Sequence, residues 1–116
     1  MIGESLSTAG FAGIEEAGGV VHARLPSSGA EFRAEPDGAL WRLTLVWPMR
    51  APEDGLRAWN RRHPEAPVEI WQGETQLSMR VSGTVPEVTR WGALAEEAVA
   101  QFLRWRREQR APGEGM

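Results

Sequence analysis

The segment from Pro86 to about Arg110 constrains the fold of this 116-residue chain more than any other feature. Apolar residues recur in it with alternating spacings of three and four, which is the period of an amphipathic α-helix. They are Val88, Trp91, Ala95, Ala98, Phe102 and Trp105. Leu94, Val99 and Leu103 widen this stripe beyond the narrow seam of a coiled coil. So wide an apolar arc on a long helix is expected to be covered by a sheet face or by a dimer core.

The segment before this helix has the pattern of a β-hairpin. Val68–Gln72 and Thr75–Ser82 are separated by Gly73-Glu74, a Gly-X pair that favours a two-residue type II′ turn. The expected pairs are Gln72 with Thr75, Ile70 with Leu77 and Val68 with Met79, all on one face. The other face is nominally polar and carries Glu69, Trp71, Gln76, Ser78 and Arg80. Trp71 is therefore expected on the polar face of the hairpin, where it is not needed to fill the core.

A second hairpin is predicted around the turn tripeptide Pro36-Asp37-Gly38, with strands Phe32–Glu35 and Leu40–Trp47. One face of the longer strand is fully apolar: Trp41, Leu43, Leu45 and Trp47. The opposite face, with Leu40, Arg42, Thr44 and Val46, is half apolar. The register of this 31–47 hairpin stays open, because a three-residue loop pairs Trp41 with Arg33 and a four-residue loop pairs it with Ala34.

The remaining segments complete the expected order. Ile2–Gly10 predicts a short helix, and glycines at 13, 18 and 19 punctuate two extended pieces, of which Val20–Leu25 is the second. Pro52 begins a surface helix that ends before Pro64, with acidic residues at its start and basic residues at its end. We therefore predict one α+β domain over residues 1–110, an antiparallel sheet with helices packed on one face in the order α-β-β-β-α-β-β-α, and a disordered tail over 111–116.

The residue inventory argues against catalysis. Cysteine and lysine are both absent, which excludes thiolate chemistry and a P-loop. The two histidines, His22 and His63, do not have a metal-ligand spacing. No serine stands in a G-x-S-x-G elbow, and the adjacent carboxylates Glu15-Glu16 and Glu96-Glu97 point in different directions on any regular element. The sequence therefore predicts a protein that is not an enzyme, with no catalytic, cofactor-binding or metal-binding residues.

Two features favour a binding function instead. Six tryptophans in so short a chain exceed what an ordinary core is expected to bury, and tryptophan is enriched at protein interfaces. The candidate protein-binding residues are Trp71, Leu40, Val46, Trp59 and Trp105. An alternative is that these residues only complete a tight core. A symmetric homodimer could use part of the same surface.

Arginine offers a different interpretation. All thirteen basic residues are arginine, and six of them form the two basic clusters, Arg61-Arg62 and Arg104 to Arg110. Arginine with tryptophan can grip and stack on single-stranded nucleic acid, which is the alternative function. The net charge of −3 and the isoelectric point near 5.4 argue against it, and helix dipoles explain both clusters.

The N-terminal residues lack the basic and long apolar regions of a signal peptide, and no stretch approaches the roughly 18 apolar residues of a membrane span. Together with the absence of cysteine, this predicts a cytoplasmic protein without a membrane partner.

The order of elements resembles that of the YbjN family, whose members share the fold of type III secretion chaperones. The resemblance is carried by EFRAEPDGALWRLTLVWP, by RAWNRRHP with its Asn-Arg pair, and by TQLSMRVSG before the last helix. It covers nearly all of the chain, although none of these segments is an invariant signature. The chain is shorter at both ends than the family and has more tryptophans. The resemblance implies a small dimeric, chaperone-like module that binds another protein, with no catalytic residues to carry over.

Overall fold

The computed structural model describes the backbone of residues 2–114 and the side chains of residues 2–109. Its elements are α1 (Ile2–Thr8), β1 (Ala12–Ala17), β2 (Val20–Arg24), β3 (Glu31–Asp37), β4 (Leu40–Trp47), α2 (Glu53–Arg62), β5 (Val68–Trp71), β6 (Glu74–Val81) and α3 (Val85–Glu114). The predicted α+β class is confirmed. The predicted order was wrong by one strand, because four strands precede α2 where three were expected. The additional strand is β1, which contains the first of the two extended pieces and is a largely exposed edge strand with little apolar signal.

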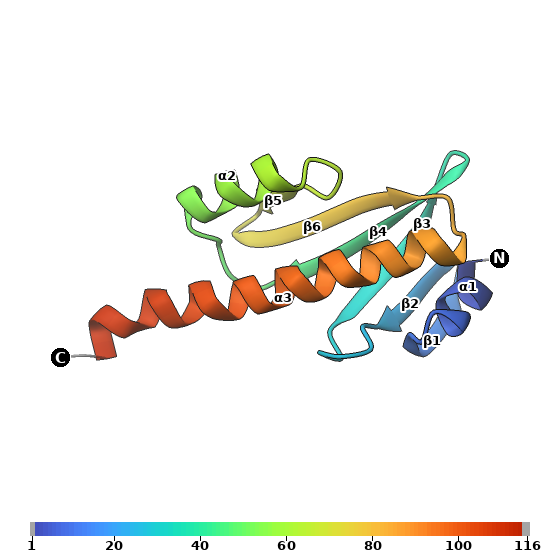
Figure 1. Ribbon diagram of the computed structural model, residues 1–116, viewed down its shortest axis with the longest axis horizontal. Coiled ribbons are helices and arrows are strands. Elements are labelled where there is room, and N and C mark those ends of the chain that lie inside the picture. The colour runs from blue at the N-terminus through green and yellow to red at the C-terminus, as the bar shows by residue number, and fades with distance from the viewer. Residues whose placement is uncertain (1, 115–116) are drawn as a thin grey trace.

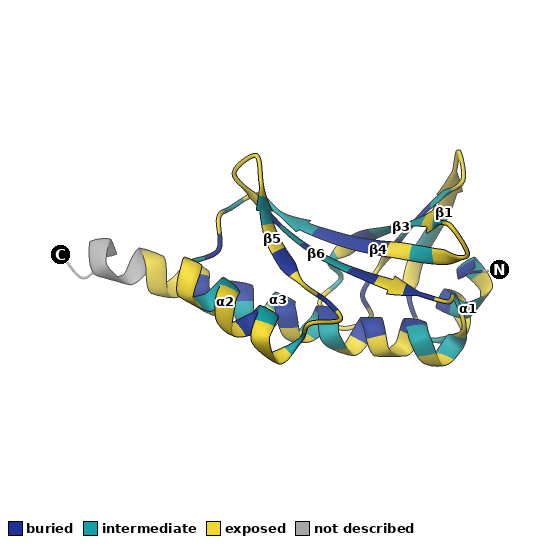
Figure 2. Cartoon of the chain, turned by 90° about the horizontal axis from the view of Figure 1, so that it is seen from above, coloured by how far each residue is buried: buried dark blue, intermediate teal, exposed yellow. Residues whose placement is uncertain are grey.

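The six strands form one antiparallel sheet in the order β1-β2-β3-β4-β6-β5. Figure 1 shows α3 running diagonally along this sheet, and Figure 2 shows all three helices on the same side of it. The other side, which we call the open face, is covered by none of the helices formed by residues 2–114. The predicted packing of helices on one face is therefore what the structure has, and the core lies between α3 and the sheet.

Alternation along each strand builds this core. Apart from Thr44, which is buried on the open face, the buried strand residues point toward the helices: Val21, Ala23, Phe32, Ala34, Leu43, Leu45, Val68, Thr75, Leu77, Met79 and Val81. From α3 they meet the predicted stripe of Val88, Trp91, Ala95, Ala98, Phe102 and Trp105, all of which are buried. The period of 3.6 on the helix and of two on the strands thus meet in one apolar layer.

The β5–β6 hairpin has a different turn from the predicted one. Its loop is Gln72-Gly73, with φ of 51° and 81°, so two consecutive positive angles make it a type I′ turn. The observed pairs are Val68 with Leu77 and Ile70 with Thr75, a shift of two residues from the expected register. Because side chains alternate with period two, this error leaves every residue except Gln72, which is now in the turn, on its predicted face.

The β3–β4 hairpin follows neither of the two registers considered. A two-residue loop, Gly38-Ala39, pairs Asp37 with Leu40 and Pro36 with Trp41. The closing pair of a two-residue hairpin exchanges both backbone hydrogen bonds, and hydrogen-bonded pairs then alternate with non-bonded ones. Pro36 therefore falls at a non-bonded position, where its missing N–H costs the sheet no bond to β4. This is why the strand continues through a residue that the sequence assigned to the turn.

The helix α3 reaches Glu114, so its backbone includes residues 111–114 of the predicted tail. The side chains from Arg110 onward, and residues 115–116 altogether, lie outside the described residues. The disorder expected over 111–116 stays a prediction.

Candidate functional site

The tryptophan surplus is smaller than the sequence indicated. Trp59 and Trp105 are 1% and 6% exposed, so two of the five candidate binding residues belong to the core. Trp59 also donates its Nε1–H to the carbonyl of Ala66 at 2.8 Å. Trp41 and Trp47 are half-buried and pack against the core cluster. Only Trp71, at 60% exposure, stands free of it. The candidate set counted these two indoles toward the surplus, although the core between the helices and the sheet has room for both.

The three other candidates lie on the open face but not together. Val46 pairs with Gln76, which pairs with Glu69, and Trp71 follows two residues later on β5. Strand spacing and rise place Trp71 about 12 Å from Val46 and Leu40 about 20 Å from Val46, at the opposite end of β4. The structure thus brings Val46 and Trp71 to one end of the open face. Leu40, at 39% exposure, is separate.

Between these ends the open face carries arginines that the sequence did not single out. Asp37 Oδ2 accepts from Arg80 Nε at 2.9 Å and from Arg42 Nη2 at 3.1 Å. Two further ion pairs lie on the same face, Arg33 with Glu35 at 3.4 Å and Arg24 with Glu31 at 3.8 Å. The sequence could have indicated this arrangement, since the two-residue alternation along each strand places these arginines on the face opposite the apolar residues. Because each of these arginines has an acidic partner, the open face is close to electrically balanced.

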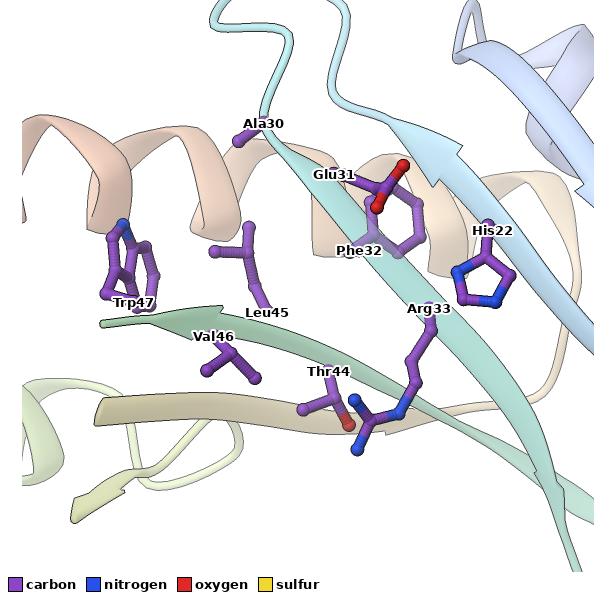
Figure 3. Close-up of a pocket in the computed structure, with 9 residues that line it drawn as sticks. All are labelled: His22, Ala30, Glu31, Phe32, Arg33, Thr44, Leu45, Val46 and Trp47. Atoms are coloured by element: carbon purple, nitrogen blue, oxygen red, sulfur yellow. The ribbon is translucent and has the colours of Figure 1, made fainter. Parts of the chain in front are cut away.

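The open face is also hollowed. Strands β3 and β4 are paired up to Arg33 and Thr44 and are unpaired beyond that point. We call the resulting opening the fork. Its volume is about 410 Å³, and its walls are residues 31–33 on β3 and 44–47 on β4, with His22 and Ala30 beside them (Figure 3). No sequence signal predicted the fork, because it depends on where a ladder stops and not on which residues form strands.

One lip of the fork is the β2–β3 loop, which α3 holds in place. The carboxylate of Glu96 accepts the backbone N–H of Ser27 at 2.6 Å and that of Ser28 at 3.1 Å. Partial burial raises the pKa of Glu96, but the hydrogen bonds from Ser28 and Ser27 lower it more, so the pKa of Glu96 lies below its ordinary value. The loop is therefore tied down by an ionised carboxylate at neutral pH.

The other lip is the connection from β4 to α2. The buried hydroxyl of Thr75 donates to the carbonyl of Met49 at 2.6 Å and accepts the N–H of Ala51 at 2.9 Å. Both lips are thus fixed by specific hydrogen bonds and not left to move freely.

The described residues contain no group of three His, Cys, Asp or Glu side chains that could hold a metal ion. His22 lies beside the fork, and His63 ends α2 with its ring 4.3 Å from that of Trp59. His63 Nε2 is 3.7 Å from Glu97 Oε1, too far for a hydrogen bond. Among residues 2–114, no helix is long and apolar enough to cross a membrane.

No family model, no curated protein and no solved structure matches this chain. The YbjN resemblance therefore stays an expectation, and function has to be argued from the residues of the open face.

Proposed function

We propose that this protein is a non-enzymatic, chaperone-like or adaptor module that binds another protein through the open face of its sheet. The observation that carries the proposal is Trp71, a large aromatic side chain that is 60% exposed on the edge strand β5, at the same end of the open face as Val46. Exposed apolar patches on small proteins mark interaction sites, and tryptophan is among the residues that supply most of the binding energy at such sites. A type III secretion chaperone-like fold, membership of the YbjN family and a cytoplasmic location are the finer parts of this proposal.

The surroundings of Trp71 support a polypeptide partner. The paired arginines and carboxylates give the open face alternating charges of both signs, which is the composition of the polar rim around an interface hot spot. The rim needs no strongly charged partner, because its own charges are already balanced.

The experiment is affinity capture of the full chain from its source cells, repeated with Trp71→Ser and Arg57→Ser. Arg57 is exposed on α2, and its partners among the described residues are Glu53 and Asp54 of its own helix. We expect Trp71→Ser to lose a partner that the wild type and Arg57→Ser both retain. A Trp71→Ser chain that keeps its stability and every partner would contradict the assignment of the open face.

We propose in addition that the protein acts as a homodimer through the exposed flank of α3. Leu103 is 53% exposed and borders an apolar groove of about 330 Å³ with Trp47, Met49, Val99 and Phe102. This groove is on the helix side, so a dimer formed there leaves the open face free. Light scattering at high concentration tests it. We expect a dimer that Leu103→Arg converts to a monomer, and a wild type that is monomeric throughout would remove this part of the proposal.

Single-stranded nucleic acid is the alternative partner, favoured by four arginines on one face with an exposed tryptophan. The pairing of these arginines with carboxylates argues against nucleic-acid binding, since a phosphate would have to displace each acidic partner. Quenching of tryptophan fluorescence by an oligonucleotide, reversed by salt, would support this alternative. No quenching at low salt would end it.

A further inference from the structure

The fork has a definite hydrogen-bonding pattern. Asp37 and Leu40 close a two-residue loop, so they exchange both backbone bonds, and every second pair after them does the same. Glu35 with Arg42 and Arg33 with Thr44 are therefore bonded pairs. The next pair in this series would be Glu31 with Val46, but β3 and β4 have separated before reaching it.

The N–H and C=O of both Glu31 and Val46 consequently point into the fork. Neighbouring ladders agree with this assignment. The N–H of Leu25 bonds the carbonyl of Ala30, which turns Ala30 and Phe32 toward β2, and leaves Glu31 turned toward β4. The N–H of Ser78 bonds the carbonyl of Pro67, which leaves Leu45 and Trp47 turned toward β6 and Val46 turned away from it. Among residues 2–114, the β3–β4 register ends at Arg33 with Thr44, and no backbone hydrogen bond of a turn or loop involves Glu31 or Val46.

Aromatic packing holds the fork open. The ring of Phe32 packs edge-on against Trp91, with centroids 5.5 Å apart, whereas Trp47 stacks on Phe102 with centroids 3.8 Å apart. Trp91 and Phe102 are eleven residues apart on α3, which is about 16 Å along the helix axis. In continued register Phe32 would pair with Leu45, so Phe32 and Trp47 would lie only two residues out of step on adjacent strands. Each strand instead follows its own aromatic partner, so the separation is built into the core.

We infer that the fork is a docking site for a short extended segment of a partner polypeptide, which completes the interrupted sheet between β3 and β4. An extended chain offers the backbone groups of successive residues alternately to its two sides. One of its residues can therefore bond Glu31 while the next bonds Val46. This matches the four free groups in number and in kind, two donors and two acceptors. The inference rests on the proposed protein-binding function and specifies the form of the partner.

A polypeptide fits these groups better than the other classes of partner. The phosphates of a nucleic acid accept hydrogen bonds but do not donate them, so they would leave the carbonyls of Glu31 and Val46 unpaired. The inner lining of the fork includes Phe32, Leu45 and Trp47, so side chains that the segment turns inward should be apolar. Both lips are fixed by Glu96 and Thr75, so the site is formed before the partner arrives and little ordering cost is added on binding.

The test starts from random heptapeptides displayed on phage and selected on the full-length wild-type chain. Val46→Pro removes the N–H that faces the fork without removing a bond to β6, because residue 46 faces away from β6. Val46→Thr is the matched control, which keeps the N–H and the branched shape. For the selected peptides we expect Kd to rise at least tenfold in Val46→Pro and to change less than about twofold in Val46→Thr.

A second arm needs no protein variant. N-methylation of the selected peptide at each of two adjacent central residues should weaken binding to the wild type at least tenfold, while N-methylation at the peptide ends should not. If Val46→Pro lowers the stability of the protein, seen as a shift of its urea midpoint, Glu31→Pro repeats the test on the β3 wall of the fork. A library that yields no binder, or peptides that tolerate N-methylation throughout, would overturn the inference.

The two proposals fail separately. Peptides whose affinity is lost in Trp71→Ser and kept in Val46→Pro and Glu31→Pro would retain protein binding on the open face and exclude the fork. Peptides that bind the fork while affinity capture finds no cellular partner would retain the fork and exclude the proposed function.

Discussion

The side chain of Asn60 on α2 bonds the backbone of Val68 on β5 in both directions. Its Oδ1 accepts the N–H of Val68 at 2.7 Å, and its Nδ2 donates to the carbonyl of Val68 at 2.9 Å. Val68 begins the edge strand of the sheet, so these two groups would otherwise be open to another strand. An amide on a helix thus replaces a neighbouring strand, which protects part of the edge from unwanted pairing.

Asn60→Ala should lower the free energy of unfolding by about 2 kcal/mol, because two partly buried hydrogen bonds are lost at about 1 kcal/mol each. Urea denaturation followed by tryptophan fluorescence measures the change. The matched control is Arg61→Ala, one residue along the same helix and exposed, for which we expect less than about 0.5 kcal/mol. Equal effects of the two substitutions would mean that Asn60 does not stabilise the edge.

Gly55→Ala should destabilise the protein, against the usual effect of this substitution in a helix. Alanine is favoured over glycine by up to about 1 kcal/mol in a helix interior. At Gly55, however, an added Cβ would lie 2.6 Å from Cε2 and Cζ2 of the buried Trp105. Overpacking of this kind costs about 1–3 kcal/mol, so we expect a net loss measured by urea denaturation.

Gly3→Ala is the matched comparison for Gly55→Ala. Gly3 also lies in a helix, and its added Cβ would meet only Cγ2 of Ile14 at 3.9 Å, an ordinary contact. We expect a gain of a few tenths to about 1 kcal/mol. If Gly55→Ala also stabilised the protein, the close packing of α2 on Trp105 would be refuted.

Glu96→Gln should reveal an acid-sensitive contribution to stability. The pKa of Glu96 is lowered in the folded protein, since the hydrogen bonds from Ser28 and Ser27 outweigh the effect of burial. A lowered folded pKa means that the contribution is fully present above the unfolded value and is lost as pH falls through the folded value. We expect Glu96→Gln to cost about 1 kcal/mol at pH 7.

This cost should shrink as the pH of the urea titrations is lowered below the ordinary carboxyl range, because the wild type then also carries a neutral side chain. Glu74→Gln, exposed in the β5–β6 hairpin, serves as the control and should show almost no cost at either pH. A Glu96→Gln cost that stays constant from neutral to acid pH would contradict the role given to the charge.

Gln72→Asn should stabilise the β5–β6 hairpin. Gln72 has a φ of 51°, the only positive φ among the non-glycine residues described, and asparagine adopts this region more readily than glutamine. We expect a gain of about 0.5 kcal/mol in urea denaturation. A loss of stability would favour the turn at Gly73-Glu74 that the sequence predicts, in which residue 72 belongs to the strand.

The faces of the elements could be predicted from sequence, and their registers could not. Trp41 and Leu77 were assigned to the apolar face correctly because period-two alternation is independent of how strands are paired. The pairing itself depends on turn geometry, where Gln72 adopts an unfavourable angle and Pro36 is tolerated at a non-bonded position. Local residue preferences predict neither of these two turns, because the free energy gained by packing the whole sheet on α3 outweighs the small local cost of each turn.

The candidate site was predictable to a similar extent. Trp71 was recognisable as a misplaced aromatic on a polar face. Trp59 and Trp105 were named as candidate binding residues but are buried, and the extent of their burial depends on how α2 packs against the sheet and α3. The fork could not be foreseen, since it results from two aromatic contacts, Phe32 with Trp91 and Trp47 with Phe102, that join residues far apart in the chain.

The most direct measurement of the central claim, that the open face presents an interrupted sheet to a partner, is amide hydrogen exchange of the free protein by NMR. The amides of Glu31 and Val46 should exchange rapidly although both residues lie within strands, while those of Arg33 and Leu45 should be strongly protected. Protection of Glu31 and Val46 as strong as that of Arg33 and Leu45 would mean that β3 and β4 are paired throughout, and would contradict the account.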